Sequence, residues 1–377
     1  MNSHHGTHND LHSESGALQD EHPGRSKNPV IKVLDLAWLE FAKPDLAASE
    51  RFAHAFGFTT VSRTADELQL RGTDAGAPCV IVRKGSRSRY LGAAFRAADS
   101  TDVVRLADAT GAKVEKLPES IGGLTVDLTD PSGAMVRVVA DTHELAMLQG
   151  QAIQVLNLGH DQPRTNATQR PPREPARIQR LGHVVLQTNR YVETLNWYLE
   201  YLGLIVSDFK YYPGQRERGP TMSFIRCDRG TTPTDHHTLA MMLGPGNRYV
   251  HSAYQVGDLD ALAAGGEYLR EQGFHRSWGI GRHIEGSQIF DYWRDPDGLL
   301  VEHFADGDLF DSTLESGWSP MTTSGLAQWG PPATKDFLGL TSGPQALREL
   351  VSMAHSLRED NEFDLTRLRG LLKVASS

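Results

Sequence analysis

The sequence predicts an α+β protein of two tandem domains, each built from two βαβββ modules. The main observation is an internal repeat. "LTDPSGAMVRVV" (128–139) aligns with "WRDPDGLLVEHF" (293–304), since each places Asp-Pro-x-Gly before an apolar run, and "SRYLGAAFRA" (88–97) aligns with "NRYVHSAYQV" (247–256). A turn followed by a short apolar run predicts a buried strand. The same elements therefore recur in the same order, as expected of a duplicated domain.

The order of elements within each half predicts the modules. "IKVLDLAWLEF" (31–41) aligns with "IQRLGHVVLQT" (178–188), and each predicted strand runs into a helix that ends at Gly57 or Gly203. On the second of these helices four apolar side chains share one face: Leu195, Tyr198, Leu199 and Leu202. Further strands and another helix follow. Two βαβββ units per half, curved around a shared cavity, are the simplest arrangement.

Polar segments mark the expected domain boundaries. Residues 1–28 are polar and poor in aromatic side chains, so we expect a disordered tail. We interpret its histidines as solvated rather than as a metal site: His4, His5, His8, His12 and His22. The first domain is expected at 29–146, a proline-rich linker at 147–177, the second domain at 178–308 and a C-terminal extension at 309–377.

The C-terminal extension contains two segments with helical spacing of Leu, Val and Met. They are "QALRELVSMAHSL" (345–357) and "FDLTRLRGLLKV" (363–374). We expect these helices to pack on the body or on a partner subunit, and we expect a homo-oligomer.

Composition favours small-molecule chemistry. The net charge of -9 over 377 residues provides no basic surface for nucleic acid or anionic lipid. The two cysteines, Cys79 and Cys227, are too few for a disulfide framework or a thiolate zinc site. No run of eighteen apolar residues and no apolar signal core is present, so we expect a cytoplasmic protein without nucleic-acid or membrane partners.

Three differences between the halves each add a potential metal ligand to the second half only. His183 aligns with Leu36, or with Ala37 if the gap falls earlier, His251 aligns with Gly92, and Glu302 aligns with Arg137. Two imidazoles and one carboxylate leave one face of an octahedral ion open, as in non-haem Fe(II) oxygenases. A carboxylate inside an apolar strand is also costly unless a cation compensates its charge.

Each of these residues alone has a simpler explanation. A single strand histidine can be a hydrogen-bonded core residue, and Glu302 can form a salt bridge with Arg282 or Arg294. Three differences at matched repeat positions favour a metal site in the second domain.

The segment "GRHIEGSQIFDYWRDPDGLLVE" (281–302) resembles the signature of type I extradiol ring-cleaving dioxygenases of the vicinal oxygen chelate superfamily. The signature is a histidine, a spacer, Tyr, two residues, Asp-Pro, Gly and then Glu. The resemblance extends through "LGHVV", "DHHTLAMM" and "YVHSAY" and covers about residues 30 to 308. It implies the vicinal oxygen chelate, or glyoxalase-like, fold. One departure is Asp291, where the family usually has an apolar residue.

The resemblance also implies roles for particular residues. His183, His251 and Glu302 would hold Fe(II), or Mn(II) in some members, and a catecholic substrate would chelate the metal beside the co-substrate O₂. His237 would hydrogen-bond the reacting oxygen and act as acid or base. His283 and Tyr292 would bond to the catecholate oxygens. The product would be of the muconic-semialdehyde type, formed in the catabolism of aromatic compounds.

Other polar and aromatic residues receive simpler interpretations. His236 and His303 each precede or follow an inward-facing residue, so alternation along a strand places them on the outer face. Surface positions are expected for His54, His275 and His355, turn roles for Asp295, Pro296 and Gly298, and contributions to the pocket wall remain open for Trp197, Tyr249, Trp293 and Phe304.

Two further readings compete with the dioxygenase. A lyase or isomerase of the same superfamily would use the metal as a Lewis acid without O₂, and would not need the trio His237, His283 and Tyr292. A non-enzymatic binding protein of the superfamily would keep the pocket but tolerate loss of that trio. A 4-hydroxyphenylpyruvate-type dioxygenase is disfavoured because its C-terminal motif is missing. The sequence does not rank catechols or dihydroxy-heterocycles as substrates.

Overall fold

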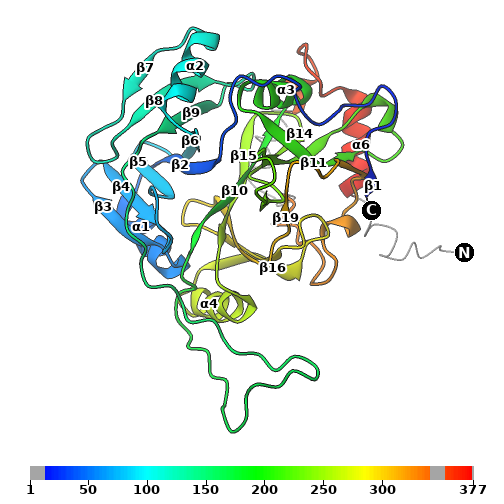
Figure 1. The fold of residues 1–377 in the computed structure, drawn as a ribbon. Helices are drawn as coiled ribbons and strands as arrows, with labels where there is room; N and C mark the ends of the chain where they lie inside the picture. Colours follow the sequence, from blue (N-terminus) through cyan, green and yellow to red (C-terminus); the bar gives the residue numbers. More distant parts are fainter. Residues whose placement is uncertain (1–12, 340–352, 376–377) are drawn as a thin grey trace, which may run out of the picture.

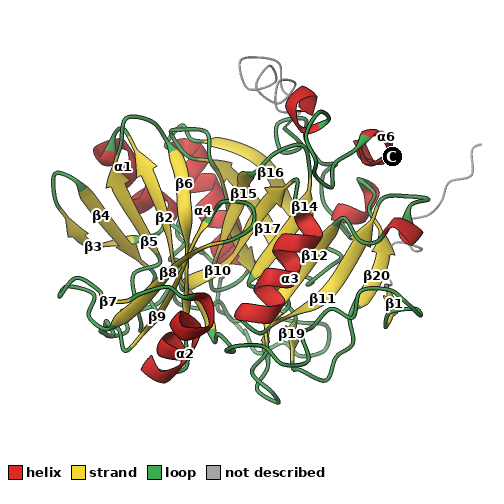
Figure 2. Cartoon of the chain, turned by 90° about the horizontal axis from the view of Figure 1, so that it is seen from above, coloured by secondary structure: helices red, strands yellow, loops and turns green. Residues whose placement is uncertain are grey.

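The structure, a computed structural model, describes residues 13–339 and 353–375. Two mixed sheets lie side by side (Figures 1 and 2). The eight-stranded first sheet has the order β3-β4-β5-β2-β6-β9-β8-β7, and the ten-stranded second sheet has the order β1-β20-β11-β12-β14-β10-β15-β18-β17-β16. Both contain one central antiparallel pair flanked by parallel neighbours: β2 with β6, and β10 with β15.

The elements of the first half are β2 (Asp35–Lys43), α1 (Leu46–Phe56), β3 (Thr59–Arg63), β4 (Glu67–Arg71), β5 (Val80–Lys84), β6 (Arg89–Arg96), α2 (Ser100–Thr110), β7 (Val114–Lys116), β8 (Leu124–Thr129) and β9 (Met135–Ala140). Asp45 and Asp99 cap the two helices by accepting hydrogen bonds from backbone N–H groups of the first turn. Gly57 ends α1 with φ +108°, and a Cβ there would lie 1.7 Å from the Ala176 carbonyl oxygen, so only glycine fits.

The elements of the second half are β10 (Arg180–Thr188), α3 (Tyr191–Tyr201), β11 (Leu204–Tyr211), β12 (Met222–Cys227), β13 (Thr234–Asp235), β14 (Leu239–Leu243), β15 (Arg248–Gln255), α4 (Leu259–Glu271), β16 (His275–Arg282), β17 (Ile289–Arg294), β18 (Leu300–Ala305), β19 (Leu309–Phe310) and β20 (Gly317–Pro320). The predicted βαβββ order is therefore present in both halves. A long loop without named elements joins the sheets and extends away from the body (Figure 1). The predicted domain limits, 29–146 for the first domain and 178–308 for the second, remain a proposal.

The prediction of a disordered tail is wrong for residues 13–28. The short strand β1 (Glu14–Ser15) pairs with β20, and Arg216 forms salt bridges with both Glu14 and Glu21. The backbone carbonyl of Gly24 accepts a hydrogen bond from the Val206 N–H at 2.7 Å. The segment has few apolar residues, and its order comes from backbone pairing and ion pairs with the second sheet. The first four histidines of the sequence lie outside the described residues.

The repeat alignment was wrong by one or two residues at β2. In the second sheet His183 pairs with Ala253, and in the first sheet Trp38 pairs with Ala94. Because Ala94 and Ala253 occupy the same repeat position, the counterpart of His183 is Trp38, neither Leu36 nor Ala37. An apolar strand fits several offsets equally well, and only pairing with the next strand fixes the register. The counterparts of His251 and Glu302 are Gly92 and Arg137 as predicted.

At the C-terminus, the helix predicted at 363–374 is confirmed as α6 (Leu365–Ala375). It docks on the second domain, where the Arg218 guanidinium forms a salt bridge of 2.7 Å with Asp364 and Gln215 donates to the Thr366 carbonyl oxygen at 2.9 Å. Most of the helix predicted at 345–357 lies outside the described residues. Among the helices that the structure describes, none combines the length and the apolar character needed to cross a membrane.

A buried ion pair joins the two halves. The Lys43 ammonium at the end of β2 contacts the Asp295 carboxylate and lies 3.1 Å from Asp297. Asp295 also accepts hydrogen bonds from the N–H groups of Asp297 and Leu299, which confirms the predicted turn role. One residue after Glu302, the ring of His303 stacks on Phe56 with centroids 3.7 Å apart and donates to its carbonyl oxygen. His303 faces away from Glu302 as predicted, but it is buried between the halves rather than exposed.

We expect Lys43→Met to lower the free energy of unfolding by about 3–5 kcal/mol, because the buried carboxylate of Asp295 then has no cation. Urea unfolding followed by circular dichroism measures the change. The exposed Lys84 provides a matched control, since Lys84→Met should stay within about 0.5 kcal/mol of the parent protein. Equal unfolding midpoints for the two variants would contradict the interpretation.

Candidate metal centre

Three adjacent strands bring the predicted ligands to one point. β15 lies between β10 and β18, and Ala253 on β15 pairs with His183 on one side and with Glu302 on the other. Directly paired residues point to the same face of a sheet, and His251 lies two residues from Ala253, on that face again. The small side chain of Ala253 leaves room between the neighbouring ligands. Register alone therefore makes the three side chains converge.

The three ligand atoms form a nearly equilateral triangle. The Nε2 atoms of His183 and His251 are 3.4 Å apart, and they lie 3.4 and 3.3 Å from Oε2 of Glu302. Ligands bound at about 2 Å and at right angles to one another are about 3 Å apart. The triangle thus fits one face of an octahedral metal ion.

The environment of Glu302 supports a cation at this point. Its side chain is fully buried, neither carboxylate oxygen has a hydrogen bond, and its neighbours within ion-pair distance in the described part of the chain are imidazoles. The alternative of a salt bridge is wrong, because Arg282 pairs with Asp306 and Arg294 pairs with Asp336. A fully buried carboxylate without a compensating charge is unfavourable, and a divalent ion would supply that charge.

The protonation states that bind a metal are favoured. Burial lowers the pKa of His251, which keeps the imidazole neutral. Burial by itself would raise the pKa of Glu302, but the close approach of the His183 and His251 imidazoles to its Oε2 outweighs burial and holds the pKa well below its usual range. Neutral imidazole and ionised carboxylate are the forms that coordinate metals.

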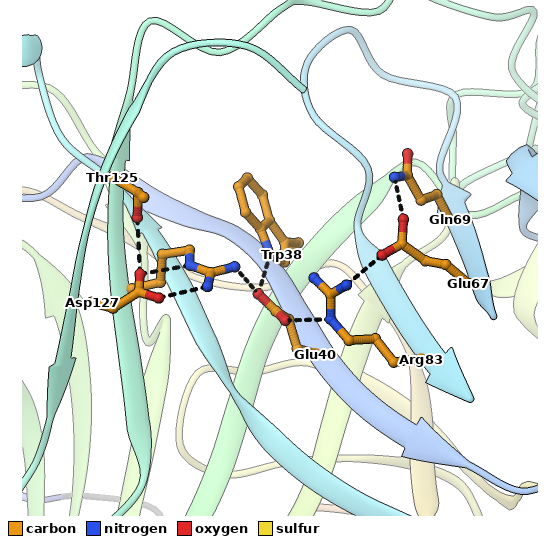
Figure 3. A network of polar contacts seen from close by, with 8 residues as sticks. Trp38, Glu40, Glu67, Gln69, Arg83, Thr125 and Asp127 are labelled. Atoms are coloured by element: carbon orange, nitrogen blue, oxygen red, sulfur yellow. Dashed lines mark hydrogen bonds and ion pairs between the residues drawn. The ribbon is translucent and has the colours of Figure 1, made fainter. Parts of the chain in front are cut away.

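The first sheet also buries a carboxylate, Glu40, but places guanidinium groups of the chain beside it. Arg137, at the position of Glu302, contacts the buried Glu40 and lies 2.7 Å from Asp127. The Trp38 indole N–H and the Arg83 guanidinium also donate to Glu40 (Figure 3), at 3.1 and 3.3 Å. Guanidinium groups of the chain therefore compensate the buried carboxylate. The predicted restriction of the metal site to the second half agrees with this arrangement.

The other three predicted site residues surround the ligand trio. His237, just before β14, has its ring centroid 4.0 Å from that of His183. His283, just after β16, places Nε2 at 2.9 Å from the Tyr292 hydroxyl and 3.8 Å from Oε1 of Glu302. Tyr292 on β17 pairs directly with Glu302. Burial lowers the pKa of both histidines and raises that of Tyr292.

His283 is fixed by a segment that the sequence left without a role. Its Nδ1–H donates to the Leu326 carbonyl oxygen at 2.7 Å, so the neutral ring has a bare Nε2 that accepts from the Tyr292 hydroxyl. Phe337 packs on Tyr292 with centroids 4.8 Å apart, and the Trp278 indole N–H donates to the Pro331 carbonyl oxygen. The C-terminal extension therefore covers this side of the site.

The interpretation of His236 as an outer-face residue is wrong. Its side chain is buried, and its Nδ1 lies 2.9 Å from Nδ1 of His237 while its Nε2 lies 2.7 Å from Oδ2 of Asp208. The two histidines precede β14, so strand alternation does not govern them. Asp208 was missed because twenty-nine positions separate it from His237 and no motif links the two.

Most of the candidate wall residues lie elsewhere. Phe304 approaches His183, with centroids 5.7 Å apart. Trp197 packs within α3, and Tyr249 packs on Phe41 from the first half. Trp293 lies on the opposite face of β17, where its indole N–H donates to Asp291. Asp291 is also salt-bridged to Arg276, so this departure from the family pattern does not touch the site. The three predicted surface histidines, His54, His275 and His355, are exposed.

The part of the chain that contains these residues is similar to known proteins. Residues 180–303 match the family model described as Glyoxalase/Bleomycin resistance protein/Dioxygenase superfamily. The chain is 27% identical over 334 residues to Metapyrocatechase 2 of Cupriavidus necator, a match that covers 87% of this chain and 98% of the relative. It is 29% identical over 133 residues to Biphenyl-2,3-diol 1,2-dioxygenase 3 of Rhodococcus globerulus, covering 33% of this chain and 61% of the relative.

Solved structures confirm the fold. An extradiol ring-cleaving dioxygenase from B. fuscum superposes with a TM-score of 0.67 at 18% identity, covering 84% of each chain. The Mn(II)-bound glyoxalase from Novosphingobium aromaticivorans also superposes with a TM-score of 0.67, at 23% identity, covering 81% of this chain and 94% of the other. The predicted α+β fold of the vicinal oxygen chelate superfamily and the resemblance to type I extradiol dioxygenases are confirmed.

We expect Glu302→Gln to weaken metal binding by at least about 100-fold, because it removes the one anionic ligand while keeping the side-chain volume. Anaerobic titration with Fe(II) or Mn(II), followed by metal analysis after dialysis, measures the loss. Glu40→Gln is the matched control from the other sheet and should leave metal content unchanged. Wild-type affinity in Glu302→Gln would show that the metal binds elsewhere.

Proposed function

We propose that this protein, whose residues 180–303 belong to the Glyoxalase/Bleomycin resistance protein/Dioxygenase superfamily, is an extradiol dioxygenase that cleaves a catecholic ring with O₂. The observation that carries the proposal is the convergence of two imidazoles and an uncompensated carboxylate, with His237, His283 and Tyr292 around them. The similarity of nearly the whole chain to a metapyrocatechase supports the same reaction. The product is of the muconic-semialdehyde type.

The metal is proposed to be Fe(II), held by His183, His251 and Glu302, although the same ligands accept Mn(II). Such an ion would supply Lewis-acid and redox chemistry for the reaction of a catechol with O₂. The three protein ligands would hold it from one side of the site. The ligands lie on strands, which hold their directions more rigidly than loops would.

On one side of the metal site, His283 and Tyr292 receive the catechol. The bare Nε2 of His283 is a proton acceptor, and the Tyr292 hydroxyl is a donor held at 2.9 Å from it. A catechol hydroxyl placed beside this pair can lose its proton to Nε2 while the Tyr292 hydroxyl donates to the resulting oxyanion. The pair would therefore bind the substrate as a monoanion and hold its orientation.

On the side of His183, His237 is the acid–base residue for the oxygen atoms that come from O₂. Its ring lies tilted against that of His183, with centroids 4.0 Å apart, and makes an edge contact with Phe224, with centroids 5.1 Å apart. An imidazole that burial keeps neutral can accept a proton and return it within one turnover. The two proposed proton-handling groups therefore lie beside different ligands, His237 beside His183 and His283 beside Glu302.

Homo-oligomerisation and a cytoplasmic location stay predictions.

Anaerobic loading with Fe(II), followed by a panel of catechols and then O₂, tests the proposal. We expect equimolar O₂ uptake and a yellow product that absorbs in the visible region. A Lewis-acid lyase or isomerase would turn over its substrate without consuming O₂, and a binding protein would bind a catechol without turnover. Either outcome would overturn the dioxygenase assignment.

We expect His237→Ala to lower kcat by about 100- to 10,000-fold, because the acid–base group is lost while the three metal ligands remain. Steady-state O₂ uptake, normalised to bound metal, measures the effect. His275→Ala removes an exposed histidine and should retain wild-type kcat. Unchanged turnover in His237→Ala would refute the role assigned to His237.

A further inference from the structure

The hydrogen bonds behind His237 form a continuous line to a carboxylate. Nδ1 of His237 lies 2.9 Å from Nδ1 of His236, and Nε2 of His236 lies 2.7 Å from Oδ2 of Asp208. A carboxylate oxygen accepts, so Nε2 of His236 carries the proton that is donated to Asp208. In the neutral ring Nδ1 of His236 is then bare, and it can only accept from Nδ1–H of His237.

We infer that Asp208 and His236 are positioning residues that fix His237 in the tautomer with the proton on Nδ1 and a bare Nε2. The inference rests on the proposed function for the role of His237 in turnover, but the tautomer itself does not depend on that function. Nδ1 is engaged by His236, so Nε2 is the ring nitrogen left to accept a proton on the substrate side. A carboxylate that sets the tautomer of an imidazole in this way is known to control catalysis in other enzymes.

The backbone and its neighbours hold His236 in place. Its N–H donates to the Asp308 carbonyl oxygen at 2.9 Å, and its own carbonyl oxygen accepts from the Ser207 hydroxyl at 2.6 Å. The rings of Phe224 and Phe310 flank the imidazole, each with centroids 5.4 Å away. These contacts leave the ring one orientation, in which both nitrogens meet their partners.

Two glycines make the space for this line of groups. A Cβ at Gly286, where φ is +77°, would lie 2.9 Å from Nδ1 of His236. A Cβ at Gly317 would lie 2.0 Å from Oδ1 of Asp208, far inside contact distance. The loop before β17 therefore packs directly against His236, and the first residue of β20 packs directly against Asp208. The fold therefore accommodates this chain of hydrogen-bonded groups specifically, because a side chain at either glycine would displace His236 or Asp208.

The polarity of the line depends on Asp208. Without an acceptor at that position, His236 can carry its proton on Nδ1 and donate to His237, which reverses the tautomer of His237. Nε2 of His237 would then carry a proton and could no longer accept one. Asp208→Leu removes the acceptor at similar volume, and His236→Phe removes the middle ring's nitrogens at similar shape.

The first test uses nitrogen-15 NMR of histidine-labelled, metal-free protein, with the His237 signals identified by their loss in His237→Gln. Imidazole nitrogen shifts distinguish the tautomers, and we expect His237 with a protonated Nδ1 in the parent protein. In Asp208→Leu we expect loss of that tautomer or a mixture. A protonated Nε2 in the parent protein, or an unchanged tautomer in Asp208→Leu, would overturn the inference.

The second test measures kinetics of the iron-loaded protein. We expect Asp208→Leu and His236→Phe each to lower kcat by about 100-fold while KM for the catechol and the bound metal change less than threefold. His22→Phe, a histidine hydrogen-bonded to Asn196 outside the site, is the matched control. Wild-type kcat in Asp208→Leu would overturn the inference. This result decides the question even if His236→Phe does not fold. If the protein proves inactive with catechols but the NMR result holds, the proposed function fails and the tautomer assignment stands.

Discussion

The carboxylate of Glu302 is the constraint on which the site depends. It is fully buried in the centre of a sheet, and its ion-pair neighbours in the described residues are imidazoles. Burial lowers the pKa of two of them, His251 and His283, and so favours their neutral form. The first sheet contains a comparable carboxylate, Glu40, but compensates it with guanidinium groups (Figure 3). The two sheets of the duplicated fold thus each bury a carboxylate. Glu40 is paired with guanidinium groups of the chain, whereas Glu302 requires an external cation. The exchange of Arg137 for Glu302 at one repeat position separates the two outcomes.

The first half contributes to the site through the strand that carries Glu302. The Asp295 turn that leads into β18 is held by Lys43, and the residue after Glu302 is held by the Phe56 carbonyl oxygen. Both contacts cross between the halves. The first half therefore fixes the position of a proposed metal ligand in the second half, which gives the duplication a structural role at the site.

Each of the two histidines proposed to handle protons, His237 and His283, has one ring nitrogen bound by the protein. Nδ1 of His283 donates to a backbone carbonyl of the C-terminal extension, and Nδ1 of His237 meets His236. Both rings then have Nε2 as the nitrogen that can face a substrate. Segments far apart in the sequence, the C-terminal extension and β11, thus set the chemistry of the histidines that line the centre.

The sequence by itself determined the duplication and predicted the ligand trio and the three residues around it, because repeat alignment and motif spacing are properties of chain order. It could not determine the register of β2, the order of residues 13–28, or the environments of His236 and His303. Those depend on which strands pair and which segments pack together. Only the tertiary structure placed Asp208 behind His237 and Leu326 behind His283, since hydrogen bonds between distant segments leave no periodic pattern in the sequence.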